Sequence, residues 1–144
     1  MTNHYKIDSI KNEEEITEIV DSINRFNYSK TTNRLNEVSK KINLVAKNDK
    51  NELVGGILSH VGYFKGLEIH ILWVKENYRN QNIGSLLIKE AEAEAIKIGA
   101  RKAILDTYSF QAKEFYLKNG YKVFGEIEDF PEGHSLFFMA KDLK

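Results

Sequence analysis

Hydrophobic residues recur at helical spacing in two parts of the chain. Residues 13–26 follow Asn12, a typical N-cap residue, and combine glutamates in the first turn with apolar positions at the helical period, so they predict a helix. A longer helix is predicted over residues 83–98, where apolar residues recur until a glycine ends the pattern. The same reasoning predicts a helix over residues 32–40 and, from a weak alternation, a first strand over residues 4–10.

Alternating or continuous apolar residues predict strands through the rest of the chain. Residues 42–47, 52–63 and 67–74 are joined by short turns rich in Asn, Lys and Gly, which is typical of an antiparallel meander. Gly55-Gly56, inside the second of these strands, indicates a bulge or a close approach of another element. The later elements predicted are a helix over residues 110–119 and strands over residues 101–108, 121–128 and 135–141.

The order of these elements predicts the fold class. Strand 67–74, helix 83–98 and strand 101–108 form a βαβ unit, whose crossover is right-handed and whose strands are parallel. The predicted architecture is therefore α/β, with a mixed central sheet that is antiparallel at both ends and parallel in the middle, flanked by helices. A length of 144 residues fits a single domain over residues 1–144.

Composition and charge exclude several function classes. The 21 basic and 21 acidic residues balance, so no basic field predicts binding to nucleic acid or to an anionic membrane. The chain has no cysteine, which excludes a disulfide framework, a thiolate nucleophile and a cysteine-ligated metal site. We see no apolar run of signal-peptide or membrane-spanning length, so we expect a cytoplasmic protein.

The stretch that says most about chemistry is residues 72–87, where a strand runs through a loop rich in Asn and directly into a helix. The first N–H groups of a helix have no internal partner and lie at the positive end of its dipole, so such a loop is an anion site. The stretch lacks the Gly-Lys-Ser/Thr of a Walker loop and the three glycines of a Rossmann fingerprint. We therefore expect a phosphate or pyrophosphate held mainly by backbone amides.

Two motifs resemble those of the GNAT superfamily of N-acetyltransferases. The acetyl-CoA loop of that family, Gln/Arg-x-x-Gly-x-Gly/Ala, is matched over Arg79–Gly84, with Asn82 in place of the usual first glycine. Asn tolerates positive φ better than other non-glycine residues, so the loop can keep its shape. The family's Ala-x-x-x-Tyr-x-x-x-Gly-Phe/Tyr is matched by residues 112–121. The resemblance covers about residues 42–141 and looks closest to small bacterial members, which carry Leu-Trp-Val before the loop and Leu-Asp-Thr…Phe-Gln-Ala after the helix.

The resemblance implies acetyl-CoA as co-substrate and no metal. It implies that the two parallel strands splay apart and that the pantetheine arm lies between them, near backbone groups of Leu72 and Val74. Arg79 and the amides of residues 81–85 would hold the pyrophosphate, and Ser109 stands where many relatives have a CoA-contacting Asn. The full set of expected cofactor contacts is Leu72, Trp73, Val74, Arg79, Asn80, Gln81, Asn82, Ile83, Gly84, Ser85, Ser109, Ala112, Phe115 and Tyr116.

The resemblance also implies roles in the direct attack of an amine on the thioester. Tyr116 would be the general acid that protonates the departing CoA thiolate. Glu68 stands where histone-type relatives carry a catalytic glutamate, and His70 is the rival base because a histidine titrates near pH 7. Both share a predicted strand face with Leu72. A base matters for a lysine-like amine, of which about one molecule in two thousand is neutral at pH 7, and much less for an α-amine.

Each candidate also has a purely structural interpretation. Glu68 can be a solvated strand residue, His70 a hydrogen-bonded core histidine and Tyr116 a helix tyrosine with a satisfied hydroxyl. Trp73 is expected in the core, and Asp106 is expected to cap or pair near the end of its strand. A solvated helix face is expected for Glu90, Glu92 and Glu94.

We therefore expect an acetyl-CoA-dependent N-acetyltransferase that acts on a primary amine of a small molecule or a protein. One alternative is a non-catalytic acyl-CoA-binding module that has lost turnover. A second is an acetyltransferase toxin acting on aminoacyl-tRNA, which the neutral charge disfavours. The acceptor stays open because residues 1–41 match the family only in general outline. The exposed edge of the predicted C-terminal hairpin favours a homodimer.

Overall fold

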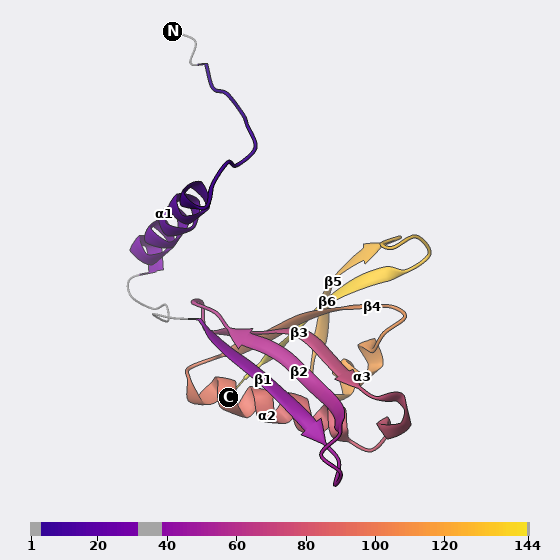
Figure 1. Cartoon of the computed structure of the whole chain (residues 1–144). Helices are drawn as coiled ribbons and strands as arrows, with labels where there is room; N and C mark the ends of the chain where they lie inside the picture. The colour runs from indigo at the N-terminus through magenta and orange to yellow at the C-terminus, as the bar shows by residue number, and fades with distance from the viewer. Residues whose placement is uncertain (1–3, 32–38, 144) are drawn as a thin grey trace. The chain divides into compact units, whose positions relative to one another are not determined.

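The computed structural model describes residues 4–31 and 39–143 (Figure 1). The chain divides into two compact units, Met1–Leu35 and Asn36–Lys144. The first unit holds helix α1 (Glu13–Thr31), and the second holds the other described elements. None of the helices in these ranges is both long and apolar enough to cross a membrane.

Helix α1 begins where the sequence predicts and runs further. The amide of Glu15 donates to Asn12 Oδ1 at 3.0 Å, which confirms Asn12 as the N-cap. The helix ends at Thr31 rather than near residue 26, and the Thr31 hydroxyl donates back to the Asn27 carbonyl at 2.9 Å. The Ser29 hydroxyl likewise donates to the Phe26 carbonyl, so both hydroxyls bond back to the preceding turn.

Two elements predicted before residue 40 have other outcomes. Residues 4–10 form no strand, so that prediction is wrong. A weak alternation forms a strand only where a neighbouring strand pairs with it, and none does here. The helix predicted over residues 32–40 falls outside the described residues except at its end, where Lys40 begins a strand.

Six strands form one mixed sheet in the second unit. They are β1 (Lys40–Lys47), β2 (Leu53–Val61), β3 (Gly66–Val74), β4 (Lys102–Tyr108), β5 (Lys122–Glu128) and β6 (Ser135–Asp142). Their order across the sheet is β1-β2-β3-β4-β6-β5. The β3–β4 pair is parallel and the other neighbouring pairs are antiparallel. This arrangement confirms the predicted fold class.

Helix α2 (Ile83–Lys97) is the crossover between β3 and β4, and it covers one face of the sheet across β1, β2 and β3 (Figure 1). The short 3₁₀ helix η1 (Glu76–Tyr78) precedes it, and α3 (Lys113–Lys118) follows β4. The core lies between α2 and the sheet. Burying each large aliphatic side chain there stabilises the fold by about 1.5–3 kcal/mol. The α2 residues that enter the core are Leu87, Ile88, Ala91 and Ala95.

Gly55 marks a close approach of β2 to the start of α2. A β-carbon on Gly55 would lie 3.1 Å from the carbonyl oxygen of Trp73 and 3.3 Å from Ile83 Cγ2. A side chain at this position would require the Trp73 carbonyl and the Ile83 side chain to move by a few tenths of an ångström. The sequence-based prediction of a close approach at the Gly55-Gly56 pair is therefore confirmed, and the contact sets the position of the first turn of α2.

Glu92 is buried, although the sequence predicts that it lies on a solvated helix face. The residue is 7% exposed, and its carboxylate accepts from the Tyr121 hydroxyl at 2.7 Å and pairs with Lys141 Nζ at 2.9 Å. Burial, and then the bond to Glu92, raises the pKa of Tyr121. The prediction fails for Glu92 because its partners come from segments distant in sequence; Glu90, in contrast, is exposed as predicted.

Near its middle, strand β3 separates from β4 and bulges against β2, with which it stays paired on both sides of the bulge. Its parallel pairing with β4 ends at Glu68 opposite Ile104, so the two strands separate beyond that point, as predicted. Its antiparallel pairing with β2 skips His70, which is an extra, bulged residue. A bulge shifts every following side chain to the other face. Leu72 accordingly packs against the core, and the predicted common face of Glu68, His70 and Leu72 is wrong for Leu72.

Candidate active site

A cleft of about 730 Å³ lies where β3 and β4 separate. Its walls come from the second half of β3, the loop that follows, the first turn of α2, and α3. Asp106 on β4 and His70 on β3 also line it. The expected cofactor contacts that line the cleft are Leu72, Trp73, Val74, Arg79, Asn80, Asn82, Ile83, Gly84, Ser85, Ala112, Phe115 and Tyr116. The two motifs, far apart in sequence, therefore meet at one cleft.

The loop between β3 and α2 presents free backbone donors to this cleft. Asn82 is the residue before the helix and has φ 66° and ψ 10°, the left-handed conformation predicted for it. The first described bond of the helix runs from the Leu86 amide to the Asn82 carbonyl at 3.0 Å. The amides of residues 83–85 precede that bond and line the positive end of the helix dipole. An anion of pyrophosphate type fits this set of donors.

Arg79 is anchored beside these amides. Its Nε donates to the carbonyl of Val74 at 3.0 Å, which ties the side chain to the end of β3. Asn80, next to it, also takes positive φ at 63°. The anchored guanidinium still has its two terminal NH₂ groups as donors, which suits a phosphate oxygen.

Tyr116 on α3 forms one wall of the cleft. Its side chain is 7% exposed and packs edge-to-face against Phe115, with ring centroids 5.2 Å apart. Burial, with the Asp106 carboxylate as the second cause, raises the pKa of Tyr116 to about 12. The phenol therefore keeps its proton throughout the physiological range, as a proton donor must.

Glu68 and His70, the two rival bases, are joined by a third side chain. His60 Nε2 lies 2.8 Å from Glu68 Oε2, and His60 Nδ1 lies 2.6 Å from His70 Nε2. The two imidazole planes differ by 7° and their centroids are 4.8 Å apart. Since the facing nitrogens are much closer than the centroids, the rings meet edge to edge through this contact rather than face to face. Of the three, His70 lines the cleft.

No sequence motif pointed to His60, although the hairpin register could have found it. The turn at residues 63–65 pairs Val61 with Leu67, and hence His60 with Glu68. The diagonal neighbour of His60 on the same face is His70. The length of the turn, which fixes the register of β2 against β3, therefore predicts this contact, whereas the identity of residue 60 alone does not.

Two expected cofactor contacts lie away from the cleft. Gln81 is exposed and its side-chain amide reaches the Asn77 carbonyl at 3.5 Å. The hydroxyl of Ser109 accepts from the Ser135 amide at 3.0 Å and so joins β4 to the start of β6. Both side chains form hydrogen bonds within or between the loops in which they lie. Their contacts with a cofactor stay predictions.

Trp73 does not lie in the core as expected. The bulge at His70 moves Trp73 away from the face that α2 covers, and the side chain is 44% exposed in the described structure. Trp73 also lines the cleft, and its expected contact with the cofactor stays a prediction.

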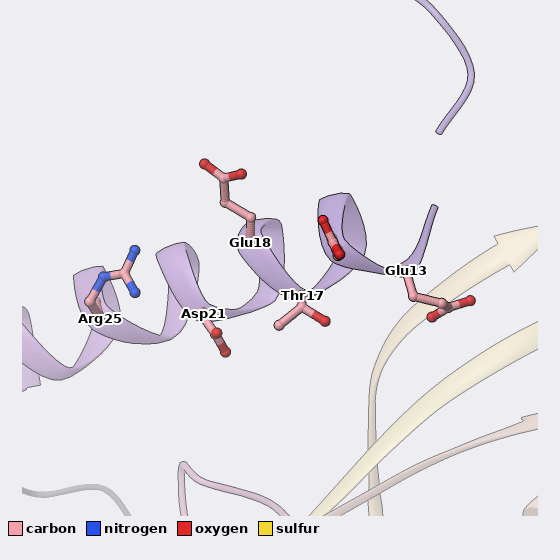
Figure 2. Close-up of a pocket in the computed structure, with 6 residues that line it drawn as sticks. Glu13, Thr17, Glu18, Asp21 and Arg25 are labelled. Atoms are coloured by element: carbon pink, nitrogen blue, oxygen red, sulfur yellow. The ribbon is translucent and has the colours of Figure 1, made fainter. Parts of the chain in front are cut away.

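Helix α1 carries a separate hollow, shown in Figure 2, whose lining is Glu13, Glu14, Thr17, Glu18, Asp21 and Arg25. No residue of α1 is buried. Glu18 and Asp21 point in different directions in Figure 2, so the acidic groups do not converge on one point. We interpret this hollow as the ordinary polar surface of a helix.

Comparison with known proteins identifies the family and the fold. A family model described as acetyltransferase (GNAT) family matches residues 9–121. The chain belongs to the GNAT family. The blasticidin-S acetyltransferase of Streptomyces morookaense is 35% identical over 96 residues, which are 66% of this chain and 70% of that protein. The crystal structure of an acetyltransferase from Bacillus cereus has a TM-score of 0.85 and 37% identity, and the match covers 96% of this chain and 98% of that one.

As a GNAT protein the chain is an N-acetyltransferase, and acetyl-CoA is its co-substrate. The same fold occurs in an aminoglycoside 6'-N-acetyltransferase complexed with coenzyme A, with a TM-score of 0.63, 24% identity, and coverage of 81% of this chain and 77% of that one. The donor set described above fits coenzyme A. Free amides and a guanidinium stand where a pyrophosphate needs them, and an open gap between β3 and β4 can take an extended arm.

Proposed function

We propose that this GNAT enzyme transfers the acetyl group of acetyl-CoA to a primary amine of a small molecule, by direct attack while both substrates are bound. The observation that carries the proposal is the cleft itself, because its lining combines a proton donor and a proton acceptor from different elements. Tyr116 lines it from α3 and His70 from β3, with the anion loop at the end of β3. Direct transfer needs a donor and an acceptor within reach of one reacting carbon.

The chemistry follows from these positions. The amine nitrogen attacks the thioester carbonyl, and a backbone N–H near Leu72 is expected to stabilise the oxyanion that forms. The carbon–sulfur bond then breaks, and Tyr116 gives its proton to the thiolate. The base removes one proton from the amine nitrogen, which leaves the amide product. The chain has no cysteine, so an acetyl group cannot rest on a thiol of the enzyme.

Three observations favour a small, positively charged acceptor. The relative with 35% identity is named a blasticidin-S acetyltransferase, which acts on a small molecule. The carboxylate of Asp106 lines the cleft on the β4 side, and a fixed negative charge attracts a substrate ammonium group. The balanced net charge offers no extended field for a large polyanion such as tRNA.

The test is a comparison of acceptors with the purified full-length chain. Acetyl-CoA is mixed with blasticidin S, with a panel of other small primary amines, and with a lysine-containing peptide, and both free CoA thiol and product mass are followed. We expect one small amine to reach a kcat/KM of about 10⁴ M⁻¹s⁻¹ or more, the range of ordinary enzymes. His4→Gln is the matched control, because it removes an exposed histidine outside the second unit. Preference for the peptide, or acetyl-CoA binding without product, would contradict the proposal.

A further inference from the structure

The sheet brings three titratable side chains into one line at the edge of the cleft. His60 on β2 is the register partner of Glu68 on β3, and bulged His70 is its diagonal neighbour on the same face. The contacts of 2.8 Å to Glu68 and 2.6 Å to His70 use both ring nitrogens of His60. His60 thus bridges two side chains that do not need to touch each other.

The direction of each hydrogen bond follows from what the groups can donate. A carboxylate has no proton to donate, so His60 Nε2 donates to Glu68. A neutral imidazole with its proton on Nε2 has a lone pair on Nδ1, so His60 Nδ1 accepts from His70 Nε2. His70 then has one nitrogen without a proton, Nδ1. The bridge therefore selects a single tautomer for each ring and leaves a basic nitrogen on the residue that lines the cleft.

We infer that Glu68, His60 and His70 form one hydrogen-bonded unit in which His70 is the base and His60 is a positioning residue. The inference rests on the proposed function. It gives Glu68 and His70 separate roles instead of treating them as alternative bases. His70 Nδ1 takes the amine proton. Glu68, through His60, orients the ring and stabilises the charge that His70 gains.

The proton balance is complete within this assignment. A substrate ammonium group first loses one proton to solvent. The neutral amine nitrogen then forms the nitrogen–carbon bond, the carbon–sulfur bond breaks, and the nitrogen loses its second proton to His70 Nδ1. Tyr116 supplies the proton that the thiolate takes. The imidazolium of His70 and the phenolate of Tyr116 then return to their starting forms by proton transfer through solvent. No oxidant, reductant or further reactant takes part.

Other charged groups that face this unit come from three elements. Lys41 on β1 is the register partner of His60, Asp106 on β4 lines the cleft with His70, and Tyr116 on α3 lines it as well. The nearest atoms of Glu68, His60 and His70 lie within 4.8 Å of one another, a set that could also hold a divalent cation. An ion would need one free atom from each side chain. Both ring nitrogens of His60 already contact Glu68 and His70, which favours the hydrogen-bonded unit over a metal site.

A double-mutant cycle tests the inference. His60→Phe keeps a ring and removes both nitrogens, and Glu68→Gln keeps the side-chain volume. We expect each single change to lower kcat with the accepted amine about 10- to 100-fold, with the KM for acetyl-CoA unchanged. The double variant should be no slower than the slower single variant, because both changes break the same chain. Losses that multiply would mean independent roles and would overturn the inference.

A readout that does not depend on turnover separates this inference from the proposed function. In ¹⁵N-labelled enzyme, a scalar coupling across the hydrogen bond should link a ring nitrogen of His60 with one of His70. Its absence, with both rings assigned, overturns the inference even if acetyl transfer is intact. Conversely, a wild-type enzyme that forms no product with any amine contradicts the proposed function, whatever the coupling shows.

Two controls complete the design. His60→Gln replaces His60→Phe if the latter lowers the melting temperature, and His4→Gln should leave both kcat and the coupling unchanged. A chelator should leave wild-type activity unchanged. Loss of activity on chelation, with recovery on adding zinc alone, would mean that the three side chains hold an ion and would overturn the inference.

Discussion

The ring of Phe115 occupies the space into which a side chain on Gly84 would project. A β-carbon on Gly84 would lie 3.1 Å from Phe115 Cζ and 3.2 Å from Cε2, with Val74 Cγ2 at 3.7 Å. Gly84 belongs to the first turn of α2 and Phe115 to α3. The absence of a side chain at residue 84 thus lets α3 approach the anion loop and narrows the cleft.

Gly84→Ala should therefore weaken both the fold and cofactor binding. The half-buried ring of Phe115 must shift by a few tenths of an ångström to make room, and mild overpacking of this kind should cost about 1 kcal/mol. Thermal unfolding and calorimetric titration with CoA measure the two effects. The control is Gly66→Ala, because a β-carbon there meets nothing within 4 Å. Phe115→Leu in the Gly84→Ala background should recover the melting temperature, and no recovery would mean that the clash lies elsewhere.

Asn82 tests whether the loop works through its backbone. Its φ of 66° is tolerated by Gly and Asn and resisted by β-branched residues. Asn82→Gly should therefore keep the CoA affinity, whereas Asn82→Val should lower it about tenfold or more, as expected for strain of about 1–3 kcal/mol in the loop. Equal CoA affinity of the Val variant and the wild type, measured by calorimetry, would show that the loop shape does not set binding.

Tyr116→Phe removes the proposed proton donor and keeps the packing of the ring. Turnover should fall about 10- to 1000-fold, with little change in the KM for acetyl-CoA or in the melting temperature. An unchanged kcat, at a pH where chemistry limits the rate, would remove Tyr116 from the mechanism.

The pH profile gives a second test of Tyr116. Its pKa is raised to about 12, so the protonated donor form persists well above the ordinary tyrosine pKa. A loss of donor through ionisation of Tyr116 should therefore be absent up to about pH 10, where an ordinary tyrosine would be half ionised. The raised pKa also predicts that the stability contributed by the neutral phenol is complete below about pH 10 and is lost as the pH rises through 12. Melting temperatures measured between pH 8 and pH 12 test whether the stability falls as the pH rises.

The pair formed by buried Glu92 and half-buried Lys141 predicts an asymmetric stability effect. Lys141→Met leaves a buried carboxylate with Tyr121 as its remaining partner and should cost about 2–4 kcal/mol, measured by urea unfolding. Adding Glu92→Gln should recover part of that cost, because the buried charge is removed and the bond from Tyr121 can persist. Lys102→Met is the control, since its ion pair with Asp142 is exposed and should be worth less than about 1 kcal/mol. No recovery in the double variant would contradict the role of the charge.

Local sequence patterns predicted the helices and strands whose formation depends on residues close together in the sequence. The helical period of residues 83–97 and the turn residues between the first strands placed most elements within a few residues. The left-handed conformation of Asn82 followed from its residue type together with the glycine that the resembling loop usually has at this position. The strand predicted over residues 4–10 failed because a strand needs a partner, and alternation does not say whether one exists.

The site was less accessible to sequence reasoning because it depends on contacts between distant segments. The same limit appears outside the site, where buried Glu92 pairs with Lys141, which is 49 residues away. The bulge at His70 turns Leu72 and Trp73 to faces opposite to those expected from simple alternation. His60 enters the site only through the register of a hairpin, a property of two strands together rather than of either residue.

The most direct test of the account follows one labelled acetyl group. The enzyme is first incubated with acetyl-CoA labelled in the acetyl group, and its intact mass is measured; the accepted amine is then added and the product mass is measured. The account predicts an enzyme of unchanged mass with acetyl-CoA alone, and label on the amine only when both substrates are present, at a rate that Tyr116→Phe lowers about 10- to 1000-fold. Label that stays on the protein as an intermediate, or that never reaches an amine while CoA binds, would contradict direct transfer in the cleft between β3 and β4.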